Sequence, residues 1–173
     1  YDTLDTLNRI ENVINRFNPI RIISIGDSFH DDNWIVRIPK DQRDRILNLT
    51  NNYEWLWIEG NHDPSGALPL GGITIPYYFD SPVTFRHEAK KGSPIGEISG
   101  HYHPKARVRL SNKSFTSRCF ITDKKRIILP AFGSFTGGLN VMDAAISTFF
   151  KDDFKILLLG SKVRQFPKTA LIP

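Results

Sequence analysis

Residues 21–27 read Arg-Ile-Ile-Ser-Ile-Gly-Asp, a mostly apolar run that ends in a glycine and an acid. A second apolar run, Trp-Leu-Trp-Ile at residues 55–58, is followed in a similar way by Gly-Asn-His at residues 60–62. Between these runs, residues 39–51 have the apolar spacing of a helix that begins at a proline. Strand, helix and strand in this order predict an α/β fold. In open α/β sheets, polar residues at the carboxyl ends of the strands form the site.

The rest of the chain divides into a helical beginning and a β-rich remainder. Residues 3–17 carry apolar side chains at helical spacing and predict an amphipathic helix. After residue 70, short β-like runs lie between Gly, Pro, Asn and Asp, at residues 73–78, 83–87, 96–99, 106–110, 115–122 and 126–130. A helix at residues 142–150 and a strand at residues 154–159 are expected to close the domain. We therefore expect two packed sheets with helices outside, the first parallel and the second mostly antiparallel.

The length and the net charge of the chain limit which kinds of protein it can be. With 173 residues, the chain is long enough for one domain with a proper core and short for two, so we expect residues 1–173 to form a single domain. The net charge of +5 comes from 23 basic and 18 acidic residues. Such a charge mildly favours a polyanionic partner, but it does not by itself identify a nucleic-acid-binding protein.

Several features indicate the cytoplasm. The single cysteine, Cys119, cannot form an internal disulfide, which fits a reducing compartment, and its strand-like surroundings indicate a structural thiol. The first twenty residues carry charges at spread positions, unlike a signal peptide. The longest apolar runs, such as residues 156–159, are far too short to span a membrane. We therefore expect a cytoplasmic protein without a membrane partner.

All five histidines lie in or beside short motifs that suit metal chemistry, because histidine is the commonest metal ligand. The motifs are Gly-Asp-Ser-Phe-His-Asp at residues 26–31, Gly-Asn-His-Asp at 60–63, Arg-His-Glu at 86–88 and Gly-His-Tyr-His-Pro at 100–104. Their order in the chain carries more information than any single motif. It predicts a phosphoesterase site that holds two metal ions.

The residue types fit this chemistry. Hydrolysis of a phosphoester needs an activated hydroxide and compensation for charge on the phosphoryl oxygens, and two cations about 3.5–4 Å apart supply both. Asp27 is suited to bridge them, because the glycine before it lets the chain turn sharply. Asn61 offers an amide oxygen, which suits a mixed site for Mn, Fe, Zn or Ni. His101 and His103 would project to one face of an extended chain, and His87 can complete the second metal's shell.

These motifs resemble those of the calcineurin-like metallophosphoesterase family, whose second to fifth sequence blocks correspond to residues 26–27, 60–63, 87 and 100–103. A closer resemblance is to the bacterial ligase-associated DNA damage response endonucleases. It rests on residues 26–31, 60–64, 100–108 and 129–140, and it extends from residue 1 to about residue 150.

The resemblance implies a four-layer α/β/β/α sandwich of two mixed sheets. The metal ligands that it implies are Asp27 as the bridge, Asn61, His87 and His101 on the second metal, and His103 on the first. His62 is implied as the catalytic residue, placed over the phosphate to protonate the leaving oxygen or to stabilise the transition state.

One block of the family is absent. The family's first block, an Asp-x-His on the opening strand, does not occur before Gly26. We therefore expect an N-terminally truncated domain whose first strand is missing. The first metal would then keep only His103 and its share of Asp27, too few ligands for tight binding.

Other polar residues of the motifs have two interpretations each. His30 and Asp31 either contact the substrate or the metal shell, or they have a structural role such as a helix cap. The alternative for His87 is an exposed position on a strand. Asp63 is expected to be a structural turn residue or an orienter of His62 rather than a ligand.

Three basic residues alternate directly after the Gly-His-Tyr-His motif: Lys105, Arg107 and Arg109. They begin beside the expected site, so Arg107 is a candidate contact for a phosphate backbone. The alternative is that they are solvated surface charges. Trp34, Trp55 and Trp57 could stack on bases, but the last two lie in an apolar run and are expected in the core.

The expected function is metal-dependent hydrolysis of phosphodiester bonds, by a DNA endonuclease or phosphodiesterase of bacterial DNA repair. Two divalent ions are expected, with manganese favoured and Fe, Zn, Ni or Mg as alternatives. The expected partners are DNA and a ligase, helicase or exonuclease. One alternative is a phosphoesterase for nucleotides or small phosphodiesters. The other is a metal-depleted, non-catalytic scaffold that binds DNA or a protein partner, which the absent first block favours.

Overall fold

The computed structural model describes residues 2–29, 34–63, 67–92, 96–110, 113–134, 136–150 and 153–172. The chain divides into two compact units: residues 1–78 with 132–135, and residues 79–131 with 136–173. The expectation of a single domain over residues 1–173 stays a prediction.

The first unit contains three helices and a three-stranded sheet. Its described elements are α1 (Asp2–Phe17), β1 (Arg21–Ile25), α2 (Trp34–Arg37), α3 (Lys40–Asn52), β2 (Glu54–Ile58), a 3-10 turn at Leu68–Leu70, β3 (Ile73–Ile75) and the beginning of β4 (Tyr77–Asp80). The strands run parallel in the order β1-β2-β3. The predicted helix at residues 3–17, the strands at 21–25 and 55–58 and the helix at 39–51 are confirmed.

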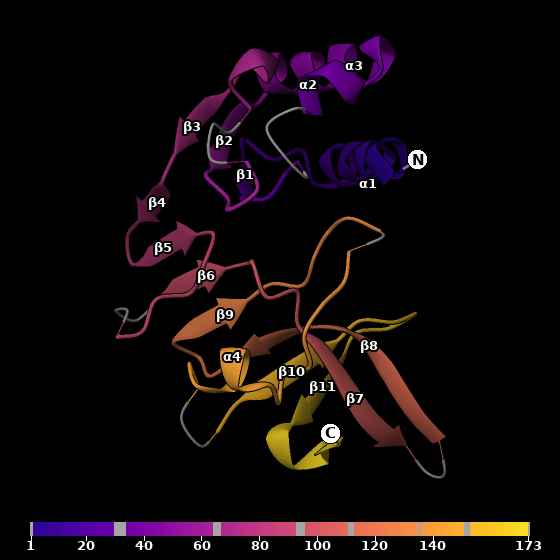
Figure 1. Ribbon diagram of the computed structural model, residues 1–173, viewed down its shortest axis with the longest axis vertical. Helices are drawn as coiled ribbons and strands as arrows, with labels where there is room; N and C mark the ends of the chain where they lie inside the picture. Colours follow the sequence, from indigo (N-terminus) through magenta and orange to yellow (C-terminus); the bar gives the residue numbers. More distant parts are fainter. Residues whose placement is uncertain are drawn as a thin grey trace. The chain divides into compact units, whose positions relative to one another are not determined.

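The helices of this unit bury the apolar faces that the sequence pattern predicts. On α1, Leu7 and Ile14 belong to the unit's hydrophobic core, and the helix ends before Asn18, which has a positive φ of 43°. Helices α1 and α3 lie side by side (Figure 1) and are joined by an ion pair between Arg45 and Glu11 at 2.6 Å. This bond lowers the pKa of Glu11 below its ordinary value.

The tryptophans of the first unit are core residues. Trp55 and Trp57 are buried, as predicted, and Trp34 is buried as well. The indole N–H of Trp57 donates to the carbonyl oxygen of Gly71 at 2.8 Å, and that of Trp55 donates to the hydroxyl of Ser24 at 3.0 Å. Satisfying these donors lets large apolar rings be buried without a lost hydrogen bond. None of the three is therefore placed to stack on a base.

The second unit is built mainly from strands. Its described elements are the end of β4, then β5 (Val83–Arg86), β6 (Glu97–Ser99), β7 (Lys105–Leu110), β8 (Lys113–Thr122), β9 (Arg126–Ile128), α4 (Ala144–Ser147), β10 (Lys155–Leu158), β11 (Arg164–Pro167), a 3-10 turn at Lys168–Ala170 and β12 (Leu171–Ile172). The main path of the sheet is β11-β10-β8-β9-β6-β5-β4, and β7 pairs with β8 and β12. The pairs β5–β6 and β6–β9 are parallel, whereas β8 pairs antiparallel with β7, β9 and β10.

The core of the second unit lies along β8, β9 and β10. Cys119 on β8 is completely buried, which confirms the structural thiol and raises its pKa from 9.0 to about 12. Glu97 on β6 is a buried acid, and its carboxylate lies 3.3 Å from the Arg86 guanidinium and 3.4 Å from that of Arg126. Two cations offset the cost of burying one carboxylate.

The predicted α/β class with two sheets is confirmed, and the sequence pattern differs from the structure in details. The run at residues 73–78 is divided into β3 and β4 at Pro76, because proline has no N–H to donate to a sheet. The predicted helix at 142–150 is limited to the four residues of α4. None of the helices in the described part of the chain is long and apolar enough to cross a membrane.

Candidate metal-binding motifs and the comparisons

The carboxyl ends of β1 and β2 bring two predicted motifs to one edge of the parallel sheet. Ile25 pairs with Ile58, so the residues that follow both strands lie together. Gly26 and Asp27 have φ angles of 72° and 48°, which gives the sharp turn that the sequence predicts at this glycine. The positive φ of Asp27 is uncommon for a residue with a side chain and marks a constrained position.

Gly60 makes room for this turn. A Cβ at position 60 would overlap the backbone nitrogen and Oδ1 of Asp27 and Oδ1 of Asp63. Only glycine allows the chain after β2 to approach the Asp27 turn this closely. Glycine is therefore required at position 60 by close packing and not by a positive φ.

Asp63 organises the Asp27 turn. Its carboxylate accepts backbone N–H bonds from Asp27 at 3.0 Å, Ser28 at 2.7 Å and Phe29 at 3.2 Å. Burial raises the pKa of Asp63, although the N–H donors of Phe29 and Ser28 partly lower it. The expectation that Asp63 is structural is confirmed by these bonds.

The side chain of Asp27 is in turn held from the second motif. The backbone N–H of His62 donates to Asp27 Oδ1 at 3.0 Å. Asn61 and His62 are both exposed. The first unit therefore assembles Asp27, Asn61 and His62 at the end of its sheet, with one acid held firmly and two polar side chains open to solvent.

Two other predicted histidines form a pair in the second unit. His87 follows β5, and His101 follows β6, which runs parallel to β5 with Arg86 opposite Ser99. Nδ1 of His101 lies 3.1 Å from Nε2 of His87, and the two rings meet edge to face at a centroid distance of 4.9 Å. His87 is only 6% exposed, so its alternative as a surface strand residue is wrong.

The spacing of the two ring nitrogens fits joint coordination of one cation. Two nitrogens about 2.1 Å from one metal are about 3.0 Å apart at a right angle and about 3.4 Å apart at a tetrahedral angle. The observed 3.1 Å between His87 and His101 lies between these values. A hydrogen bond between one donor and one acceptor nitrogen has the same length, so the geometry fits a metal without requiring it.

The loop that carries His101 and His103 differs from the extended chain that the sequence analysis assumes. Both residues have positive φ angles, 66° and 48°, and lie outside the strands. The sequence analysis expects the two side chains to project to one face because the residues are two positions apart. That reasoning is wrong here, since side chains alternate in this way only in an extended chain. The proline that follows, Pro104, directly precedes β7.

Two neighbouring residues, Tyr102 and Gly138, help to fix this loop. The hydroxyl of Tyr102 donates to Glu88 Oε1 at 3.0 Å, and burial together with Glu88 raises the pKa of Tyr102. A Cβ on Gly138 would overlap the carbonyl oxygen of His103, so this glycine permits a close approach. No local sequence signal links Tyr102 to Glu88 or residue 138 to residue 103, because both contacts depend on the tertiary fold.

The remaining candidates have different positions. Arg107 lies on β7 and is exposed. His30 and Asp31 lie outside the described residues, so their roles stay predictions. The structure thus brings Asp27 together with Asn61 and His62 in one unit, and His87 together with His101 in the other.

Comparison with solved structures gives an informative likeness. The crystal structure of nuclease MPE from Pseudomonas putida matches the chain with a TM-score of 0.71 and 25% sequence identity, over 95% of this chain and 78% of the other. No protein-family model matches the chain, and no curated protein does. The chain therefore shares the fold of a nuclease.

Proposed function

We propose that this protein is a metal-dependent phosphoesterase of the calcineurin-like metallophosphoesterase type that hydrolyses phosphodiester bonds in nucleic acid. The observation that carries the proposal is the 3.1 Å separation of His87 Nε2 and His101 Nδ1, a spacing that suits two ligands of one cation. The likeness of the fold to that of a nuclease gives independent support.

The ligand set of the proposal is that of the sequence motifs: Asp27, Asn61, His87, His101 and His103, with two divalent ions and manganese as the favoured metal. The donors are carboxylate, amide and imidazole groups without a thiolate, and such sets suit Mn, Fe, Zn, Ni or Mg. When bound, the two ions would compensate charge on the phosphoryl oxygens and activate a water for attack on phosphorus.

The chain's own residues would orient and complete this chemistry. The three N–H bonds to Asp63 hold the Asp27 turn, and the His62 N–H orients the Asp27 carboxylate. The His62 side chain is exposed, as a residue that meets a substrate must be, and it would donate a proton to the leaving oxygen.

The favoured substrate is DNA, and the favoured role is that of an endonuclease in bacterial DNA repair, beside a ligase, helicase or exonuclease. The net charge of +5 is compatible with a polyanionic substrate. The name of the matched structure, a nuclease, supports the same substrate class. A cytoplasmic location would suit this role.

The test combines metal content with hydrolysis. Metal is removed from the protein with EDTA, the protein is reloaded with Mn²⁺, and bound manganese is measured by mass spectrometry. Cleavage of circular single-stranded DNA to the linear form is then followed on gels. His87→Ala and His101→Ala should each lower activity more than about 100-fold, because even residues that only orient metal ligands contribute 10–100-fold. Lys40→Ala is the control, since Lys40 is exposed and paired with Asp44 in the first unit.

Three results would contradict parts of the proposal. Full activity of His101→Ala would exclude a metal site in which His101 is a ligand. Hydrolysis of bis(4-nitrophenyl) phosphate without cleavage of DNA would favour a phosphoesterase for small substrates. DNA binding by a protein that takes up no transition metal would favour the non-catalytic scaffold.

A further inference from the structure

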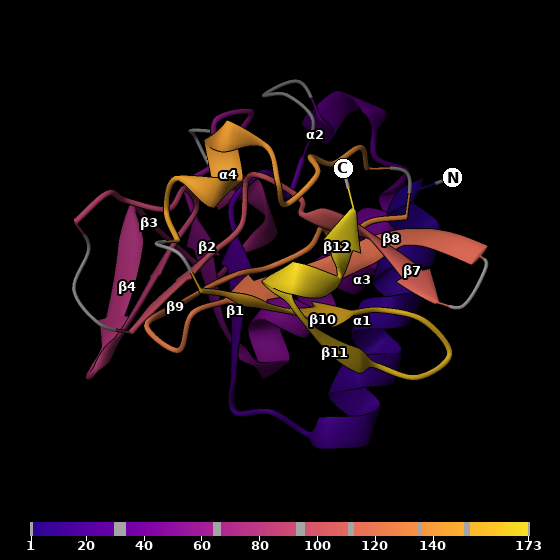
Figure 2. The same ribbon diagram turned by 90° about the horizontal axis from the view of Figure 1, so that it is seen from below.

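The excess positive charge of the chain is concentrated in one stretch. Residues 100–122 contain five Lys and Arg residues and no Asp or Glu, so this stretch alone equals the net charge of +5. It comprises the histidine loop and the antiparallel hairpin of β7 and β8. Figure 1 shows the hairpin extending from the remainder of its unit, and Figure 2 shows β12 at its side.

The register of the hairpin places most of these charges on one face. Residues directly opposite each other in an antiparallel pair share a face, and the faces alternate along each strand. The pairs on one face are Lys105 with Arg118, Arg107 with Thr116, and Arg109 with Ser114. We name this the basic face, consisting of Lys105, Arg107, Arg109 and Arg118.

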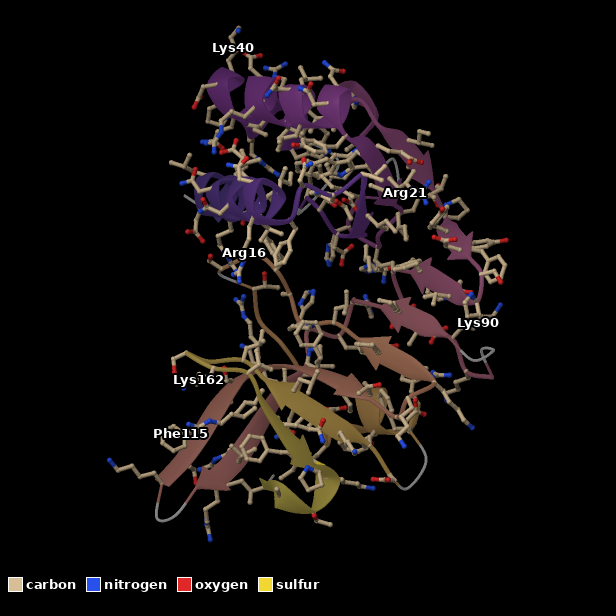
Figure 3. All side chains as sticks on the ribbon, turned by 180° about the vertical axis from the view of Figure 1, so that it is seen from behind. Arg16, Arg21, Lys40, Lys90, Phe115 and Lys162 are labelled. Atoms are coloured by element: carbon tan, nitrogen blue, oxygen red, sulfur yellow. The ribbon has the colours of Figure 1, made fainter. Side chains whose placement is uncertain are left out.

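The opposite face of the hairpin has a different character. Ala106 and Val108 on β7 are completely buried, and Val108 lies opposite Phe115. Lys113 also belongs to this opposite face by alternation and is exposed. Phe115, labelled in Figure 3, is partly exposed near the end of the hairpin. The hairpin is therefore two-sided, apolar where it packs and cationic on the other side.

Three charges of the basic face, those of Lys105, Arg107 and Arg109, are not neutralised within the described part of the chain. There, Lys105, Arg107 and Arg109 form no ion pair, and Arg107 and Arg109 are exposed. Lys105 lies directly opposite Arg118, which donates to the carbonyl oxygen of Ala131 at 3.1 Å. Like charges directly opposite each other on a sheet are destabilising. Lys105, Arg107 and Arg109 are therefore available to bind a polyanion.

The row of cations begins at the histidine loop. Lys105 follows His103 by two residues, and Arg107 and Arg109 continue outward along β7. Alternate residues of an antiparallel strand are about 7 Å apart. Successive cations can therefore meet successive phosphates of one extended strand, with the row starting beside two candidate metal ligands.

We propose that the basic face of the β7–β8 hairpin binds the sugar-phosphate backbone of a single-stranded DNA substrate, on one side of the phosphate to be cleaved. This inference rests on the proposed function and adds how the substrate is held. The contacts go to phosphates, so binding is independent of base sequence and sensitive to salt. The row of Lys105, Arg107 and Arg109 along β7 matches a single sugar-phosphate backbone.

The decisive experiment compares Arg107→Ala/Arg109→Ala with Lys113→Ala. All three positions lie on the same hairpin, but Lys113 lies on the opposite face, so its removal lowers the charge without altering the basic face. Binding of a fluorescein-labelled 20-nucleotide oligothymidylate is measured by anisotropy in EDTA, which separates binding from cleavage. Circular dichroism melts of each variant check that it is folded.

The double variant should bind the oligonucleotide about tenfold more weakly at low salt, because two charge-assisted contacts are lost. Its plot of log K against log salt should be less steep by about 1.4, since each phosphate contact with single strands contributes about 0.7. Lys113→Ala should change the affinity less than about twofold and retain wild-type hydrolysis of bis(4-nitrophenyl) phosphate.

Several outcomes would overturn the inference. Wild-type affinity and salt dependence in the double variant would exclude the basic face. A loss as large in Lys113→Ala would indicate a general charge effect. An equal loss of affinity for polyglutamate, or a stronger preference for duplex than for single strands, would exclude the assigned ligand. If the wild-type protein hydrolyses neither DNA nor bis(4-nitrophenyl) phosphate, the proposed function is wrong. If the wild-type protein cleaves DNA but the double variant binds DNA as the wild type does, only this inference is wrong.

Discussion

Gly60 lies so close to Asp27 that a single additional carbon at position 60 would overlap the Asp27 backbone nitrogen. The chain after β2 thereby touches the turn after β1, and the His62 N–H reaches the Asp27 carboxylate from this position. This close packing joins the Asp27 motif to the Gly60 motif, although α2, α3 and β2 lie between them in the sequence. It makes the conformation of Asp27 sensitive to a residue that carries no functional group.

Gly60→Ala should therefore destabilise the protein by about 1–3 kcal/mol, the usual cost of forcing an extra carbon into a packed site. Urea unfolding followed by circular dichroism measures the change. Gly137→Ala is the matched control, because a Cβ at Gly137 would meet nothing within 4 Å. A Gly60→Ala protein as stable as the control would mean that the Asp27 turn can move without cost.

The three N–H bonds to Asp63 lead to a second prediction. Asp63→Asn replaces one acceptor oxygen with an NH₂ group, which leaves at least one donor of the turn unpaired at a cost of about 1–3 kcal/mol. Asp44→Asn is the control. It removes an exposed ion pair with Lys40 on α3, which contributes roughly 0.2–0.5 kcal/mol.

Thermal melts of both variants and manganese titrations measure the effects. The Asp63 substitution should lower stability and metal affinity together, because the turn that it holds carries Asp27. Wild-type metal affinity in a destabilised Asp63→Asn protein would show that the turn keeps its shape without these bonds.

Much of the fold could be predicted because its signals are local. β1, α3 and β2 lie where the apolar runs and the proline at position 39 predict them. The sequence pattern does not predict β11 and β12, because β11 has three exposed residues and no apolar alternation, and β12 has only two residues. Their pairing with β10 and β7 depends on strands that are close only in the folded chain.

The sequence motifs predict which residues would form the candidate site, but they do not predict the conformation of the loop that carries His101 and His103. Motif order identified His87 and His101, and the structure places their nitrogens 3.1 Å apart. The expected extended conformation of His101 and His103 is wrong, because both residues have positive φ angles. The burial of His87 could not be read from its charged neighbours, since burial depends on the strands packed around it.

Tyr102 gives a third prediction, about the loop between the two histidines. Tyr102→Phe removes the hydroxyl that donates to Glu88 but retains the ring, which packs edge to face on His101 at 4.8 Å. Loss of one hydrogen bond to a carboxylate should cost about 1.5–3 kcal/mol in unfolding free energy. Tyr102→Ala should cost about 3–5 kcal/mol, because it also empties space in the core. Equal losses in the two variants would mean that the hydroxyl, rather than the ring, anchors the loop.

Cys119 gives a fourth prediction, about pH. Burial raises its pKa from 9.0 to about 12, so the folded protein holds its thiol proton at pH values where the unfolded chain releases it. Stability from this group is complete below about pH 9 and falls as pH rises toward 12, because the unfolded chain then binds fewer protons than the native state. At pH 10 the loss should be on the order of 1.4 kcal/mol, the equivalent of one pKa unit.

Urea unfolding of the wild type and of Cys119→Ala at pH 8 and pH 10 measures this effect, since alanine has no proton to lose. The wild type should lose more stability than the alanine variant between the two pH values. In the folded protein the same thiol should react with Ellman's reagent only as fast as the protein unfolds, because Cys119 is completely buried. Rapid labelling of the folded protein together with parallel pH profiles would contradict the raised pKa.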